Sequence, residues 1–326
     1  MTDGPLLRVE DLRVEFRTLA GRTRPLDGVS LEVGRGEVVG LVGETGCGKT
    51  LTGLAVLGLL PSSATVVGGR VVFDGIDLLG LDARAVRAVR GRRVAMVFQN
   101  PTGALNPVFT IGTQIGQVVT THLGVRGRAA SDRVREVLGW VGLPETARVM
   151  GSYPHQLSGG MLQRAMIAMA LSCGPELLIA DEPTTALDVT IGAQILALLR
   201  RLQEEQGFSV IFITHDLGVA RRVTDRVVVL YAGRVAESGR TADLLAAPLH
   251  PYSRGLIGAV PRPTTRGSAL AMIPGSVPAD PGAVTGCTFA DRCAIAVDRC
   301  RVERPPLRSL APGHAVACHL AEVPAS

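Results

Sequence analysis

The stretch Gly43-Glu-Thr-Gly-Cys-Gly-Lys49-Thr50 decides the fold of this chain. It matches G-x-x-x-x-G-K-[ST], a pattern in which glycines let backbone N–H groups converge on phosphate oxygens. The apolar run Val38 to Val42 precedes it, and a helix is predicted over residues 49–60. The N-terminus of such a helix adds partial positive charge at the same place. The sequence therefore predicts a phosphate-binding loop between a strand and a helix of an α/β protein.

Lys49 is the only lysine in the chain, since the other 33 of the 34 Lys and Arg residues are arginine. Its compact ammonium group suits the β- and γ-phosphates better than an arginine fork does. Thr50 is expected to ligate Mg²⁺. The residues predicted to bind the nucleotide here are Gly43, Glu44, Thr45, Gly46, Cys47, Gly48, Lys49, Thr50 and Leu51.

Polar residues also end two other apolar runs. Asp181 and Glu182 follow Leu177-Leu-Ile-Ala, where Asp181 is predicted to bind Mg²⁺ and Glu182 to activate the attacking water as a general base. His215 follows Val210-Ile-Phe-Ile-Thr, at the strand edge where α/β proteins build ligand sites. It is predicted to reach the γ-phosphate or the water, although a lone histidine can also be a hydrogen-bonded structural residue.

Strands and helices alternate along much of the chain, which favours a mostly parallel sheet with crossover helices. Predicted helices cover residues 158–173 and 190–206, and predicted strands cover 176–181 and 208–213. Residues after about 247 are rich in Pro, Gly and Cys and lose this periodicity. The expected organisation is 1–103 first part of the core, 104–156 helical insertion, 157–246 second part of the core and 247–326 C-terminal extension.

The composition of the 326 residues is that of a globular protein, with 46% hydrophobic and 19% charged residues. The most apolar run, residues 51–60, is too short to cross a bilayer. The N-terminal segment lacks a basic region followed by an apolar block, so we expect no signal peptide and a cytosolic protein. The net charge of +5 contains no run of five like charges, which indicates a scattered arginine surface and no nucleic-acid partner.

A second glycine motif points to a family. Leu157-Ser158-Gly159-Gly160-Met161, followed by Gln163-Arg164, closely resembles the signature motif of ABC ATPases. The resemblance implies a P-loop NTPase (RecA-like) core with a mixed β-sheet, flanking helices and an inserted helical subdomain. It also implies that Ser158, Gly159 and Gly160 bind the γ-phosphate of ATP held by the opposite subunit, in an ATP sandwich.

Three further residues acquire roles from the same resemblance. Gln99 looks like the family's Q-loop glutamine, which contacts Mg²⁺ and senses the membrane subunit. Asp188, in Thr185-Ala-Leu-Asp188, looks like the D-loop aspartate that passes between the two subunits. Phe16 is a candidate for stacking on adenine, with a strand-core role as the alternative.

The resemblance extends to a subgroup. Pro154-His-Gln-Leu-Ser-Gly-Gly-Met, His250-Pro-Tyr-Ser-Arg-Gly-Leu and Ile273-Pro-Gly-Ser-Val-Pro are similar to oligopeptide/dipeptide importer ATPases, especially the D-type subunit. This implies ATP hydrolysis that drives uptake of short peptides, at the cytoplasmic face of the membrane. The implied partners are a second, paralogous ATPase subunit, two transmembrane permease subunits and an extracytoplasmic solute-binding protein. Nickel or another small solute is the alternative cargo, and a soluble non-transport ABC ATPase is the alternative function.

Four of the six cysteines, Cys287, Cys293, Cys300 and Cys318, fall close together in the C-terminal segment. Disulfides are disfavoured in the cytosol, and four thiolates in a loop-rich segment suit Zn²⁺ or an iron–sulfur cluster. Their spacing lacks the short C-x₂₋₄-C steps that are common in structural zinc sites. The D-type resemblance implies a [4Fe–4S] cluster on these residues, alongside ATP and Mg²⁺ as cofactors.

Overall fold

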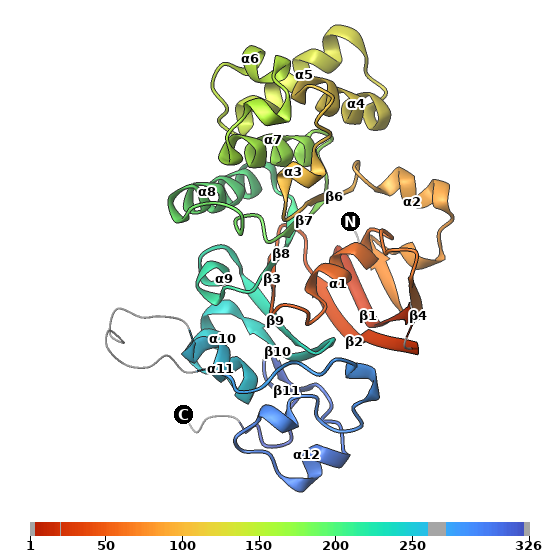
Figure 1. Cartoon of the computed structure of the whole chain (residues 1–326), viewed down its shortest axis with the longest axis vertical. Coiled ribbons are helices and arrows are strands. Elements are labelled where there is room, and N and C mark those ends of the chain that lie inside the picture. Colours follow the sequence, from red (N-terminus) through yellow and green to blue (C-terminus); the bar gives the residue numbers. More distant parts are fainter. Residues whose placement is uncertain (1–3, 20, 260–271, 323–326) are drawn as a thin grey trace. The chain divides into compact units, whose positions relative to one another are not determined.

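The computed structural model describes residues 4–19, 21–259 and 272–322 (Figure 1). The chain divides into two compact units. Unit 1 contains Met1–Gly34, Val38–Leu79 and Phe212–Ser326, and unit 2 contains Arg35–Glu37 and Gly80–Ile211. The short helix η1 (Leu78–Gly80) and strand β8 (Ser209–Thr214) each have residues in both units.

Unit 1 contains an antiparallel sheet in the order β2-β1-β4-β5. Its strands are β1 (Leu7–Thr18), β2 (Gly21–Val33), β4 (Ala64–Phe73) and β5 (Ile76–Asp77). Leu7, Val9, Leu12 and Val14 of β1 are buried. The alternation shifts by one residue after Val9 because Asp11, with φ 48°, forms a bulge that keeps the apolar side chains on one face.

Unit 1 also contains strands of a mixed sheet in the order β11-β12-β10-β9-β3. They are β3 (Val38–Val42), β9 (Arg226–Tyr231), β10 (Arg234–Arg240), β11 (Arg308–Ala311) and β12 (His314–Val316). Only β3 and β9 pair in parallel among these strands. Ala232 and Gly233 join β9 to β10 with φ 46° and 70°, which is the left-handed pair of a tight hairpin turn. These strands therefore form the mixed sheet that the family resemblance implied, whereas the alternation of strands and helices alone favoured a mostly parallel one.

The helices of unit 1 flank these strands. They are α1 (Lys49–Val56), α9 (Leu217–Val223), α10 (Thr241–Ala246), α11 (Pro251–Gly258), α12 (Asp298–Val302) and the short helices η4 (Pro281–Ala283) and η5 (Ala290–Arg292). Helix α1 is shorter than the predicted 49–60. It stops because Gly58 adopts φ 60° and the Leu59 N–H reaches back to the Leu54 carbonyl, as in a Schellman motif.

The segment after residue 247 has more regular structure than its composition indicated. Strand β12 pairs with β10, with Val316 opposite Glu237. Phe289 packs in a buried cluster with Tyr231 and Tyr252, at ring-centroid distances of 5.1 and 5.4 Å. Short pieces of helix and strand therefore attach this segment to the mixed sheet of unit 1.

Unit 2 contains a parallel strand pair and a group of helices. The strands are β6 (Val94–Val97) and β7 (Leu177–Asp181), with Val94 opposite Leu177. The helices are α2 (Ala83–Val89), α3 (Pro101–Ala104), α4 (Ile111–Leu123), α5 (Gly127–Trp140), α6 (Thr146–Gly151), η2 (Pro154–Gln156), α7 (Gly159–Leu171) and α8 (Val189–Gln206). Helices α7 and α8 begin and end within two residues of the predicted ranges. In Figure 1, α4, α5 and α6 gather above α7, in the region expected to be a helical insertion.

The described residues contain no helix that combines the length and apolar character needed to cross a membrane.

Candidate functional site: a phosphate loop and a strand-end acidic pair

The phosphate loop lies between β3 and α1 of unit 1, as predicted. Two of its glycines are required by close contacts. A Cβ on Gly43 would lie 2.2 Å from the Leu230 carbonyl oxygen, and a Cβ on Gly48 would lie 2.4 Å from Leu26 Cδ2. Gly48 also has φ 103°, where side chains are strained. The loop therefore packs closely against β2 and β9, because glycine at positions 43 and 48 has no Cβ to clash with these strands.

Lys49 is the first residue of α1 and is only 5% exposed. Its Nζ donates to the carbonyl oxygens of Gly43 and Glu44, at 2.7 and 3.0 Å. A buried ammonium group is costly unless it is hydrogen-bonded, and these two bonds hold its charge inside the loop. Thr50 follows on the exposed side of the helix start. The single lysine of the chain therefore lies where the motif requires it.

Cys47 is also a buried residue of the loop. Burial raises the pKa of its thiol, although the nearby Lys49 ammonium opposes this shift. Its carbonyl accepts from the Gly233 N–H at 3.0 Å, in the turn between β9 and β10. We infer that Cys47 is a packing residue that anchors the loop.

Two residues of the C-terminal segment contact the loop, and neither was predicted from the sequence as a site residue. Arg292 forms a two-bond ion pair with the Glu44 carboxylate, at 2.7 and 3.0 Å. The Tyr252 hydroxyl accepts from the Glu44 N–H at 2.8 Å. The only signal for Tyr252 was its place in His250-Pro-Tyr-Ser, and Arg292 carried none beyond its position next to Cys293.

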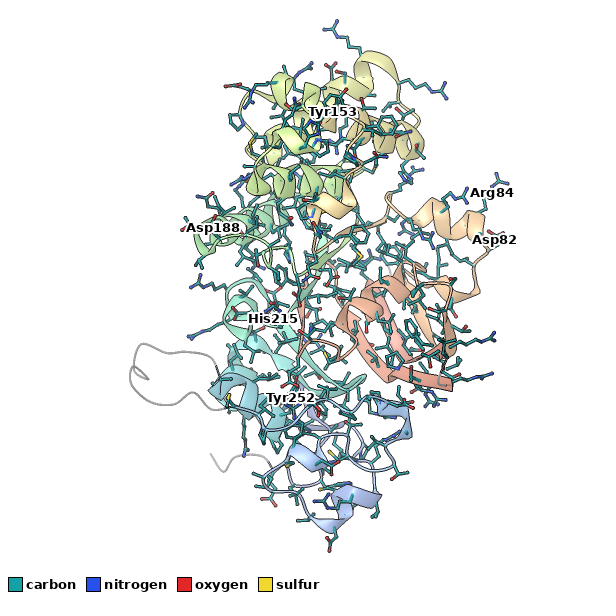
Figure 2. The ribbon with its side chains drawn as sticks, viewed as in Figure 1. Asp82, Arg84, Tyr153, Asp188, His215 and Tyr252 are labelled. Carbon is teal, nitrogen blue, oxygen red and sulfur yellow. The ribbon has the colours of Figure 1, made fainter. Side chains whose placement is uncertain are left out.

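His215 and Phe16, also in unit 1, occupy different environments. His215 directly follows β8 and is exposed, and the next residue, Asp216, caps helix α9 by accepting from the Gly218 N–H at 2.7 Å (Figure 2). Phe16 is half-buried in β1, opposite Thr23 and Ala64. The histidine is thus accessible at a strand end.

In unit 2, the acidic pair ends β7. Asp181 is the last residue of this buried strand and is 4% exposed. Glu182 has φ 44°, a left-handed conformation that costs on the order of 1–3 kcal/mol for a residue other than glycine and that is frequent at active sites. Its Oε2 accepts from Gln99 Nε2 at 3.1 Å and from Thr185 Oγ1 at 2.9 Å. The structure therefore brings Gln99 and Glu182, 83 residues apart, into direct contact.

Ser158 begins helix α7 as its N-cap, with Oγ accepting from the Met161 N–H at 3.4 Å. Asp188 begins α8 in the same way and accepts from the Ile191 N–H at 2.9 Å (Figure 2). A Cβ on Gly160 would lie 2.9 Å from Ile191 Cγ2, so close packing on α8 alone already requires this glycine. The two helix N-termini thus present backbone N–H groups of the kind that binds anions.

The four C-terminal cysteines line one small cavity, together with Phe289 and His319. All four are free thiols. Burial, and to a lesser extent the neighbouring cysteines, raise the pKa of Cys287 to about 11, and burial also raises the pKa of Cys293. The donor chemistry suits a metal cluster. Even so, the described residues contain no group of three or more His, Cys, Asp or Glu side chains arranged to hold a metal ion.

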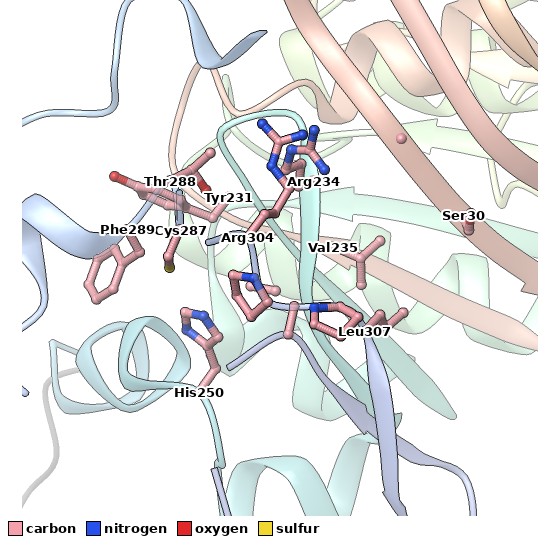
Figure 3. A pocket seen from close by; sticks show the side chains of 15 residues that line it. Ser30, Tyr231, Arg234, Val235, His250, Cys287, Thr288, Phe289, Arg304 and Leu307 are labelled. Carbon is pink, nitrogen blue, oxygen red and sulfur yellow. The ribbon is translucent and has the colours of Figure 1, made fainter. Parts of the chain in front are cut away.

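A larger cavity, of about 270 Å³, lies beside the cysteines in unit 1 (Figure 3). Tyr231, Cys287 and Phe289 line it, and so do Arg234 and Arg304. Both of these arginines bind the buried Asp27 carboxylate. Because its lining includes no residue of the phosphate loop, this cavity is distinct from the candidate nucleotide site.

Comparison with known proteins identifies the family. The family model described as ABC transporter matches residues 26–185. The model described as oligopeptide/dipeptide transporter, C-terminal region, matches residues 236–300. Among solved structures, the chain is similar to an ATP-binding cassette dimer in a post-hydrolysis state bound to ADP and Pi. The TM-score is 0.65 and the identity 30%, over 72% of this chain and 98% of that chain.

Two relatives match nearly the whole chain. A probable peptide ABC transporter ATP-binding protein from Sinorhizobium fredii is 50% identical over 96% of this chain and 94% of its own length. The dipeptide transport ATP-binding protein DppD of Escherichia coli is 43% identical over 96% of each chain. These matches confirm the resemblance drawn from the motifs. This chain belongs to the ATP-hydrolysing, ATP-binding subunits of ABC transporters, in the group that carries the oligopeptide/dipeptide transporter C-terminal region.

Proposed function

We propose that this subunit lies at the cytoplasmic face of the membrane, where its ATP hydrolysis drives the uptake of short peptides into the cell. The observation that carries the proposal is the phosphate loop, where Lys49 is buried and held by the carbonyls of Gly43 and Glu44. Peptide as the cargo is supported by the names of relatives at 43–50% identity over nearly the full chain. The proposed partners are a paralogous ATPase subunit, two permease subunits and a solute-binding protein.

For hydrolysis, we assign the following roles. Lys49 would hold the β- and γ-phosphates. Thr50 and Asp181 would each be a ligand of Mg²⁺, an ion that supplies positive charge for the phosphoryl oxygens. The Glu182 carboxylate accepts a proton from the attacking water, and His215 positions the water or the γ-phosphate. Gln99 is hydrogen-bonded to the Glu182 carboxylate at 3.1 Å, so a shift of Gln99 would change the hydrogen bonding of the base.

The same chain contributes to a second nucleotide. We propose that Ser158, Gly159 and Gly160, with Asp188 near the subunit boundary, act on ATP bound to the partner ATPase. Ser158 and Asp188 are the N-cap residues of α7 and α8. This position supports the role, because the backbone N–H groups at a helix N-terminus favour anions such as phosphate. Residues 104–156 would form the helical subdomain that, with Gln99, contacts the permeases.

For the C-terminal cysteines, we propose a structural [4Fe–4S] cluster, supported by the convergence of Cys287, Cys293, Cys300 and Cys318 on one cavity. Binding would deprotonate the thiols and draw them together, since a coordinating thiol loses its proton. Anaerobic purification followed by iron and sulfide analysis tests this. Stoichiometric zinc without iron, or no metal at all, would contradict the cluster.

Substitutions separate nucleotide binding from hydrolysis. In the purified complex, Glu182→Gln should bind ATP normally but hydrolyse it about 10²–10⁴-fold more slowly, the range expected for loss of a general base. Lys49→Ala should weaken nucleotide binding itself. Glu204→Gln is the matched control, because Glu204 pairs with Arg200 on the exposed face of α8. Near-normal turnover by Glu182→Gln would refute the assignment of the base.

Cargo is tested separately, through the solute-binding protein that is proposed as a partner of this subunit. We expect calorimetry to show that this partner protein binds short peptides and does not bind nickel. Tight nickel binding without peptide binding would replace the proposed cargo and leave the ATPase assignment intact.

A further inference from the structure

Arg292 is a buried cation in the C-terminal segment, and its guanidinium group donates hydrogen bonds to other residues of the protein. Its side chain is 6% exposed, against 27% for its partner Glu44. Besides the two bonds to Glu44, its Nε donates to the Pro274 carbonyl at 2.7 Å and its Nη2 to the Ile273 carbonyl at 3.3 Å. The guanidinium group also lies 5.6 Å from the centre of the Tyr231 ring. A fixed network therefore holds this charge against the second residue of the phosphate loop.

Tyr252 holds the backbone of the same loop residue. Its hydroxyl accepts from the Glu44 N–H, and its fully buried ring packs against those of Tyr231 and Phe289. Glu44 is thus bound through its side chain by η5 and through its backbone by α11. The Glu44 carbonyl in turn accepts from Lys49 Nζ at 3.0 Å. The C-terminal segment therefore fixes the residue that helps to hold the lysine.

The charge of Glu44 makes this contact important for an anionic ligand. A carboxylate on a phosphate-binding loop repels phosphates unless a cation neutralises it. Lys49 and Glu44 alone leave the loop neutral, whereas Arg292 restores a net charge of +1. The ion pair is bidentate and largely desolvated, the geometry in which an arginine–carboxylate pair is strongest and most directional.

We propose that Arg292 is a positioning residue for nucleotide binding: it neutralises Glu44 and, with Tyr252, holds the phosphate loop in the conformation that accepts ATP. The C-terminal segment then contributes directly to nucleotide binding. This inference rests on the proposed role of the loop residues.

The test measures the Kd of the full-length chain for methylanthraniloyl-ATP by fluorescence. Arg292→Gln should raise the Kd about tenfold, because a charge-assisted pair is lost and a carboxylate is left unpaired on the loop. Glu44→Gln should raise the Kd less than Arg292→Gln does, since it removes the anion together with the bonds. The double variant Arg292→Gln/Glu44→Gln should bind nucleotide more tightly than Arg292→Gln, because no unpaired charge remains. Arg292→Lys should fall between the wild type and Arg292→Gln, since it keeps the charge without the fork.

Arg301→Gln is the matched control, because Arg301 lies in the same segment and pairs with Asp291 on the surface. It should bind like the wild type. An unchanged Kd for Arg292→Gln, or a double variant as weak as Arg292→Gln, would overturn the inference. If Arg292→Gln does not fold, the test rests on Arg292→Lys, and a wild-type Kd for that variant would overturn the inference. Lys49→Ala is measured in parallel, since normal binding by this variant would refute the proposed nucleotide site instead.

Discussion

Glu237 of β10 provides the sharpest test of how the C-terminal segment is attached. Its carboxylate is fully buried and accepts three hydrogen bonds. Oε1 accepts from the Leu249 N–H at 2.8 Å and lies 2.7 Å from His314 Nε2, and Oε2 accepts from the His250 N–H at 2.9 Å. One side chain therefore joins β10 to the start of α11 and to β12.

Two substitutions remove different parts of this attachment. Glu237→Ala deletes all three bonds and leaves the Leu249 and His250 N–H groups buried without their acceptor, which should lower the free energy of unfolding by about 4 kcal/mol. Glu237→Gln can retain the Oε1 bonds but places an NH₂ group against the His250 N–H. Its cost should be about 2 kcal/mol, the penalty for one buried unsatisfied donor.

Urea unfolding followed by circular dichroism measures both variants, and limited proteolysis reports whether the C-terminal segment is released first. Glu303→Ala is the control, because Glu303 pairs with Arg299 on the exposed surface and should leave the midpoint unchanged. A Glu237→Ala midpoint equal to the wild-type value, with no faster cleavage after residue 247, would refute the idea that this carboxylate holds the segment in place.

Two further predictions concern the second nucleotide and the thiols. Ser158→Arg should impair hydrolysis without removing ATP from this chain's own phosphate loop. Complexes that combine one mutant and one intact ATPase subunit test this. A nucleotide-binding defect confined to the mutated chain's own loop would contradict it. In metal-free protein, the raised pKa of Cys287, about 11 against an ordinary 9.0, should slow its alkylation at pH 8 about a hundredfold relative to the unfolded chain, because the thiolate is the reactive form. Mass spectrometry of iodoacetamide labelling measures the rate, and equal rates in native protein and in urea would disprove the protection.

The local features of the nucleotide site could be predicted from the sequence because each depends on a short segment. The loop around Lys49 needs only a strand, glycines and a helix start in succession, and all of these lie within residues 38–56. The same holds for Asp181 and Glu182 at the end of β7, and for Ser158 at the start of α7. The spacing of apolar residues along a helix and the capping residues at its ends can both be read from a short stretch of sequence. The ends of helices α7 and α8 were therefore predicted to within two residues.

Contacts between distant segments could be found only in the tertiary structure. Arg292 is separated from Glu44 by 248 residues and Tyr252 by 208, and no pattern in a single sequence links such positions. The pairing of β12 with β10 was missed for a related reason: three residues, His314–Val316, are too few to show an alternating pattern, and the strand is stabilised by its neighbour. The sequence by itself thus determined the phosphate loop and the acidic pair at the end of β7. The tertiary structure decided which side chains hold that loop, because burial and charge pairing depend on what the fold brings together.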